Sequence, residues 1–246
     1  MRFSAQNAAP AWPVLAWATV ALAGLFAPAA ALLLLAVSPD SGSSADLGSP
    51  VLAVTLMGAG MIGAAAAGRF WIGLGLALFG GIIMIALAYA SGAASLANPL
   101  LAGLAFVIAS ISFAARGALF SRSAGKTGWW IAVFVVAGEA AMLAVAWAQP
   151  GALPLWLLTL LPAQWASTAI AAALTGTAAS LAMPALLALG GTATATLFVA
   201  RMLPRRWPYL VMFTSWLALS AYVYQNSPPS PALLHTSAIH EATHAL

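Results

Sequence analysis

The chain consists of long apolar runs separated by short polar or glycine-containing breaks. A helix needs about 20 apolar residues to cross the hydrocarbon core of a bilayer, and most of these runs approach that length. The pattern therefore predicts an all-α fold, a polytopic transmembrane helix bundle. The predicted spans cover residues 12–37, 51–68, 71–90, 98–115, 128–148, 180–200 and 208–224.

Residues 152–176 do not follow this pattern. The stretch is apolar, but two prolines, a glutamine and a glycine interrupt it. We expect it to be interfacial or re-entrant, or else to form an extra span. Residues 1–224 are treated as a single transmembrane helical domain, and residues 225–246 as a polar C-terminal tail.

The distribution of basic residues predicts the orientation, because cytoplasmic loops of membrane proteins are enriched in Lys and Arg. Arg2 precedes the first span, Arg69 follows the second and three basic residues at 116–126 follow the fourth, while the loops between them lack basic residues. A cytoplasmic N-terminus places all these groups inside. The basic group at 201–206 is also cytoplasmic if residues 152–200 cross the membrane only once. This favours seven spans; eight spans, with both termini inside, is the alternative.

Composition places the protein in the membrane and excludes several kinds of site. Hydrophobic residues make up 63% of the chain and charged residues only 5%, against about 25% charged in a soluble domain. We expect a multi-pass protein of the bacterial inner membrane. Its net charge of +4 arises from few groups, so it gives no indication of nucleic acid as a partner. The absence of cysteine excludes disulfides, thiolate metal sites and cysteine nucleophiles.

Small residues recur at four-residue spacing in the second and third spans. Such residues line one helix face and allow backbones to approach closely in lipid. The predicted helix-packing residues are Gly60, Ala64, Gly68, Gly73, Ala77 and Gly81. The short step between the two sets predicts a tight antiparallel hairpin. These faces pack either within the bundle or against a partner subunit.

One acidic residue, Glu139, falls near the middle of the predicted span 128–148. Burying a charge in a membrane costs about 2.5–3.5 kcal/mol on insertion scales, so such residues are candidates for function. Glu139 is either a proton or cation site, or a protonated carboxyl hydrogen-bonded to a hydroxyl or backbone carbonyl. The predicted spans contain no Lys, Arg, His or second acid as its partner, and Gly138 beside it would admit a neighbouring helix.

The remaining chemistry is sparse. No histidine precedes His235, and the sole lysine, Lys126, is predicted in a loop, so the spans offer neither an imidazole for haem nor a lysine for a retinal Schiff base. The tail contains His240-Glu241-Ala242-Thr243-His244, which fits the zinc motif H-E-x-x-H. It lacks a third ligand, because His235 cannot converge with both histidines on one helix. His240 and His244 are thus weak metal candidates; we predict no catalytic residue and no cofactor, but expect bound lipids.

The segments WWIAVFVVAGEAAMLAVAWA and LPLWLLTLLPAQWASTAIAAALTGTAASLAMPAL resemble a helix pair in subunit III of haem-copper (cytochrome c or quinol) oxidases. The resemblance covers about 55 of 246 residues. It implies a subunit without a redox centre that packs beside a catalytic subunit, with lipids in its cleft, and it places the family's buried acid at Glu139. Met183-Pro184 stands where the family has paired histidines, four spans rather than two precede the acid, and the family's pattern would have 152–176 cross fully.

Taken together, these features favour a non-catalytic integral subunit of a bacterial inner-membrane complex, such as a respiratory one, that stabilises partner subunits and contacts membrane lipids. The alternative is a small-solute or proton-coupled transporter or channel that uses Glu139. Double glycines at 80–81 and 190–191 interrupt two spans, and paired broken helices are typical of transporters.

Overall fold

The computed structural model describes residues 12–37, 44–92, 96–177, 179–202 and 207–227. Within these ranges the chain forms helices and turns, without a strand. Five described segments are long and apolar enough to cross a membrane, and the longest, Pro99–Ala148, contains two helices joined by a short turn. An all-α, multi-pass membrane architecture is therefore confirmed.

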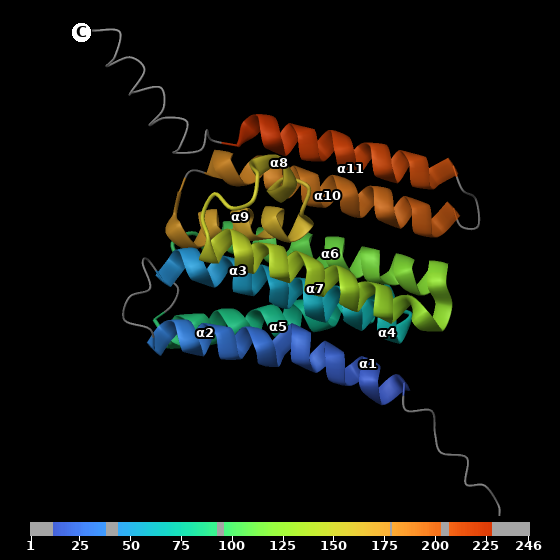
Figure 1. Ribbon diagram of the computed structural model, residues 1–246, viewed down its shortest axis with the longest axis horizontal. Coiled ribbons are helices and arrows are strands. Elements are labelled where there is room, and N and C mark those ends of the chain that lie inside the picture. The colour runs from blue at the N-terminus through green and yellow to red at the C-terminus, as the bar shows by residue number, and fades with distance from the viewer. Residues whose placement is uncertain (1–11, 38–43, 93–95, 178, 203–206, 228–246) are drawn as a thin grey trace, which may run out of the picture.

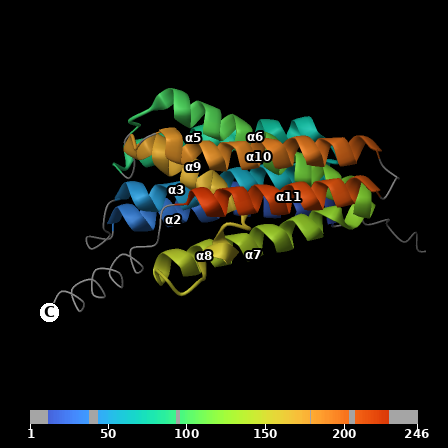
Figure 2. The ribbon, with the colours of Figure 1, turned by 90° about the horizontal axis from the view of Figure 1, so that it is seen from above.

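The long helices lie side by side and alternate in direction (Figures 1 and 2). The first two are each interrupted by a π turn: α1 (Trp12–Ala21), η1 (Leu22–Phe26) and α2 (Ala27–Val37), then α3 (Ser44–Met57), η2 (Gly58–Ile62) and α4 (Gly63–Ala67). The remaining elements are α5 (Phe70–Ala90), α6 (Pro99–Ala124), η3 (Gly125–Thr127), α7 (Gly128–Ala148), α8 (Leu155–Leu158), α9 (Pro162–Thr175), α10 (Ala179–Met202) and α11 (Trp207–Asn226).

The two π turns meet where the first two long helices touch. Pro28 lacks an amide hydrogen and its ring would clash with the carbonyl of Gly24, four residues earlier, so η1 widens the helix just before the proline. A Cβ on Gly24 would lie 2.8 Å from the Cα of Ala59, and one on Gly58 would lie 2.6 Å from the carbonyl oxygen of Ala23. The backbones are in direct contact there, and only glycine permits this separation.

The small-residue faces of the second and third long helices lie against each other inside the bundle. A Cβ on Gly73 of α5 would overlap the carbonyl oxygen of Gly60 and the side chain of Ala64, and a Cβ on Gly60 would lie 3.2 Å from that of Ala77. Gly68 ends α4 with φ +66° in the left-handed region, which an L side chain rarely adopts. This turn directs α5 back along the helix that precedes it.

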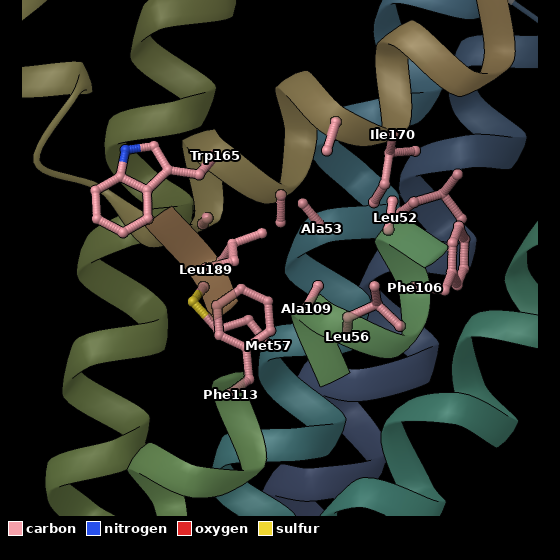
Figure 3. Packing of buried hydrophobic residues seen from close by; sticks show 14 of the residues in the cluster. Leu52, Ala53, Leu56, Met57, Phe106, Ala109, Phe113, Trp165, Ile170 and Leu189 are labelled. Atoms are coloured by element: carbon pink, nitrogen blue, oxygen red, sulfur yellow. The ribbon is translucent and has the colours of Figure 1, made fainter. Parts of the chain in front are cut away.

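The core lies between α3, α6, α9 and α10 (Figure 3). Phe113 of α6 and Leu56 of α3 are fully buried, and Trp165 of α9 is 1% exposed. Helix α9 has only 14 residues and, unlike α3, is not continued by further helical turns. Most of its side chains are nevertheless buried among the other three helices, so this short helix lies at the centre of the packing.

Helix α6 extends well beyond the predicted span 98–115, as far as Ala124. The prediction ended the span at the first basic residue, but Arg116 lies inside the helix and is followed by another apolar turn. The helix continues because its later polar groups find partners: Arg122 Nη1 donates a hydrogen bond to the carbonyl oxygen of Ala200, at 2.6 Å. The charge pattern suggested that Arg116 lies in a loop, but the residue lies inside α6.

Every described Lys or Arg other than Arg116 lies at one end of the bundle, on the right in Figure 1. Arg69 follows α4, Arg122 and Lys126 are at the α6–α7 turn, and Arg201 is in the last turn of α10. We call this the basic end. The starts of α6 and α10 lie at the opposite end.

Candidate functional site

The segment between α7 and α10 enters the bundle and leaves it at the same end. Helix α7 finishes at the end opposite to the basic end, yet α9 begins beside the middle of α7, where the amide of Ala163 bonds to Glu139. At the other end of α9, the amide of Asn98 at the start of α6 donates to the carbonyl oxygen of Ala173, at 2.9 Å. Helix α9 is about 21 Å long, shorter than the roughly 30 Å hydrocarbon core. Residues 149–176 therefore enter the bundle from one end and return to that same end.

Glu139 caps the inner end of this segment. Its side chain is 9% exposed, and Oε2 accepts a hydrogen bond from the amide of Ala163 at 2.8 Å. The first residue of α9, Pro162, has no amide hydrogen, and the preceding residue, Leu161, has no side chain that can cap the helix. A helix N-terminus carries unsatisfied amides and partial positive charge. A carboxylate on α7 therefore provides the cap that α9 lacks in its own sequence.

Arg116 provides an opposite charge nearby, from α6. Its Nη2 donates to Thr192 Oγ1 of α10 at 3.2 Å, and its guanidinium lies 5.9 Å from the centre of the Phe113 ring. Its Nη1 is buried without a hydrogen-bond partner. The opposite charges of Arg116 and Glu139 attract each other through the interior, without a direct hydrogen bond between the two side chains. The two groups therefore form a polar centre linking α6, α7, α9 and α10, which we call the central charge pair.

The expectation that Glu139 has no basic partner in the spans was wrong. It followed from ending the fourth span before Arg116. The sequence contained one indication that Arg116 lies inside the helix. The run Gly117-Ala118-Leu119-Phe120 follows it directly, and a further apolar turn indicates that the helix continues. Gly138 was also misjudged: a Cβ there would meet nothing within 4 Å, so no helix lies against that position.

The central charge pair can have two roles, one structural and one chemical. It can hold α9 in place, because charge-assisted hydrogen bonds are the stronger ones in proteins. A carboxyl group at this depth can also take up or release a proton if water reaches it. Among the described residues there is no group of three His, Cys, Asp or Glu that could hold a metal ion. His240 and His244 lie outside the described residues.

A second feature is a wide apolar groove on the outer surface, which we call the membrane groove. Its volume is about 620 Å³, and it lies between the first long helix and α7 with α3 as its floor. One wall includes Ala27 and Ala31, and the other includes Ala140 and Ala144. Its lining is almost wholly apolar, so its surface suits an apolar occupant within the bilayer.

Searches of family models, curated proteins and solved structures gave no match to this chain, so its function must be inferred from these two features.

Proposed function

We propose that the chain is a non-catalytic integral subunit of a bacterial inner-membrane complex, such as a respiratory complex, and that it binds a membrane-spanning helix of a partner subunit in the membrane groove. The groove is the observation that carries this proposal. It is long enough to follow much of α7, since its lining extends from Val133 to Trp147 on that helix.

The lining of the groove favours a helix over lipid chains. Ala23, Ala27 and Ala31 recur every four residues on one wall, and Ala140 and Ala144 do so on the other. Alanine at this spacing makes a smooth face along which a second helix backbone can approach closely. A lipid chain needs no such regular face.

The same proposal includes the topology. We place the basic end in the cytoplasm, following the positive-inside rule, with seven crossings and a cytoplasmic N-terminus. The supporting observations are the gathering of Arg69, Arg122, Lys126 and Arg201 at one end and the re-entrant path of residues 149–176. A re-entrant segment adds no crossing. Helix α10 therefore starts at the end where α7 finishes, and it ends at the basic end.

Ala140→Phe is expected to displace the partner, because the added ring would occupy the groove. The measurement is extraction of the tagged full chain in a mild detergent, followed by quantification of co-purifying membrane subunits. We expect a loss of roughly tenfold or more, which corresponds to about 1.4 kcal/mol of binding free energy. Ala141→Phe is the matched control, since Ala141 is exposed but is not among the groove residues.

Two outcomes contradict the subunit proposal. Wild-type protein that elutes as a single species, with no other subunit, removes the proposed role. Equal co-purification with Ala140→Phe and Ala141→Phe removes the groove as the binding surface.

A second candidate function is proton-coupled transport of a small solute, and the re-entrant segment favours it. Transporters often place the N-terminus of a short or broken helix near the middle of the bilayer, at the binding site. Here the N-terminus of α9 lies at the central charge pair, where Glu139 accepts from the amide of Ala163. In this alternative Glu139 carries the proton.

Glu139→Gln is expected to abolish proton flux in this second function, because an amide cannot take up and release the proton. It retains an oxygen that can accept from the amide of Ala163, so the fold should be kept. The measurement uses proteoliposomes with an internal pH-sensitive dye and an imposed membrane potential. Wild type should exceed protein-free liposomes and the variant should match them. Equal flux in both proteins, or none in wild type, contradicts the coupling.

A further inference from the structure

A pocket lined by both polar and apolar side chains opens between α8, α9, α10 and α11, at the end of the bundle away from the basic residues. Its volume is about 320 Å³. The hydroxyl and amide side chains that line it include Thr159, Gln164, Thr168, Thr175, Asn226 and Ser227. None of the described lining residues is charged. We call this pocket the α9 vestibule.

The vestibule follows one face of α9 into the bundle. Gln164, Thr168 and Thr175 share this face because they are four and seven residues apart. Ala166 and Ala173, on the opposite side of the helix, are buried. The distance along the helix from Thr175 to Gln164 is about 16 Å. The inner end of the vestibule therefore lies about halfway through the bundle, one residue from the amide that Glu139 caps.

The hydroxyl groups of the vestibule offer mainly acceptors. Thr168 Oγ1 donates to the carbonyl oxygen of Gln164 at 2.9 Å, and Thr175 Oγ1 to that of Ala171 at 2.8 Å. Ser227 Oγ donates in the same way to the carbonyl oxygen of Val223, at 2.8 Å. Each oxygen keeps free lone pairs after donating its proton. These oxygens can therefore still accept hydrogen bonds, and neutral donors match them.

We infer that the α9 vestibule is a water-accessible binding site for small, neutral hydrogen-bond donors, entered only from the end opposite to the basic end. It gives water a route from that side toward the α9 N-terminus. The inference depends on neither candidate function, since it concerns a surface that the membrane groove does not include.

Single-cysteine variants provide the test, because the natural chain contains no cysteine. Gln164→Cys and Thr168→Cys are placed in bilayer nanodiscs and treated with 2-hydroxyethyl methanethiosulfonate, a small neutral hydroxyl compound. The reaction requires a thiolate, which forms in water and not in hydrocarbon. Gly138→Cys is the matched control, since Gly138 lies beside Glu139 but faces open space on the outer surface.

Both vestibule cysteines should react at least about tenfold faster than Gly138→Cys, consistent with a thiolate fraction that depends on hydration. Equal rates at the three positions would overturn the inference. Reaction at Thr168→Cys is then compared in sealed vesicles of each orientation, with the reagent outside and free cysteine trapped inside as a scavenger. Entry from the side that labels Ser227→Cys supports the inference, and entry from the side that labels Ser123→Cys overturns it.

Discussion

Glu139→Leu is expected to lower the free energy of unfolding by about 3–5 kcal/mol, the cost of removing one partner of a buried charge pair. Leucine cannot accept from the amide of Ala163, so α9 loses its cap, and Arg116 keeps its charge without the carboxylate. The measurement is denaturation of the purified protein in mixed micelles with increasing sodium dodecyl sulfate, followed by tryptophan fluorescence.

A double variant separates the lost cap from the uncompensated charge. Removing both of two buried, opposite charges that attract each other is often nearly neutral, whereas removing one is not. Glu139→Leu combined with Arg116→Met should therefore recover most of the stability lost in Glu139→Leu, with a remaining deficit of about 1 kcal/mol for the lost hydrogen bond. Strictly additive losses would show that the two charges do not interact.

Gly73→Ala is expected to destabilise the bundle by about 1–3 kcal/mol, the usual cost of overpacking a well-packed contact. The new methyl group would overlap the carbonyl oxygen of Gly60 and the side chain of Ala64, and backbone cannot move aside as a flexible side chain can. The same denaturation in mixed micelles measures the loss.

Gly75→Ala is the matched control for this substitution. Gly75 lies two residues further along α5, and a Cβ there would meet nothing within 4 Å. Its replacement should be neutral or stabilising by about 0.5–1 kcal/mol, because alanine is the better helix former. Equal losses at Gly73 and Gly75 would show that the close contact is not what stabilises the hairpin.

The partners of Glu139 illustrate what sequence reasoning missed. Its position in the middle of a long apolar run identified it as an unusual group. Its two partners are 23 residues earlier and 24 residues later in the chain, on α6 and at the start of α9. No local pattern links them, and the truncated fourth span removed Arg116 from consideration.

The path of residues 149–176 was only partly predictable from the sequence. The two prolines, the glutamine and the glycine of this segment already suggested that 152–176 differs from a full span, and re-entry was one of three possibilities. The sequence could not choose among them, because the path depends on where α9 begins relative to α7. That point is decided by Glu139 and by the packing of Trp165 and Ile170 among α3, α6 and α10.

The sequence by itself determined the helical membrane class, because only helices satisfy their backbone groups within a single apolar segment. It also identified the small-residue faces and the unusual acid, since composition and spacing are local properties. The tertiary structure decided which helices touch and that Arg116 lies inside the bundle. It also decided that residues 149–176 return to the end of the bundle from which they enter. These depend on contacts between distant segments, whose free energies arise only when the helices pack together.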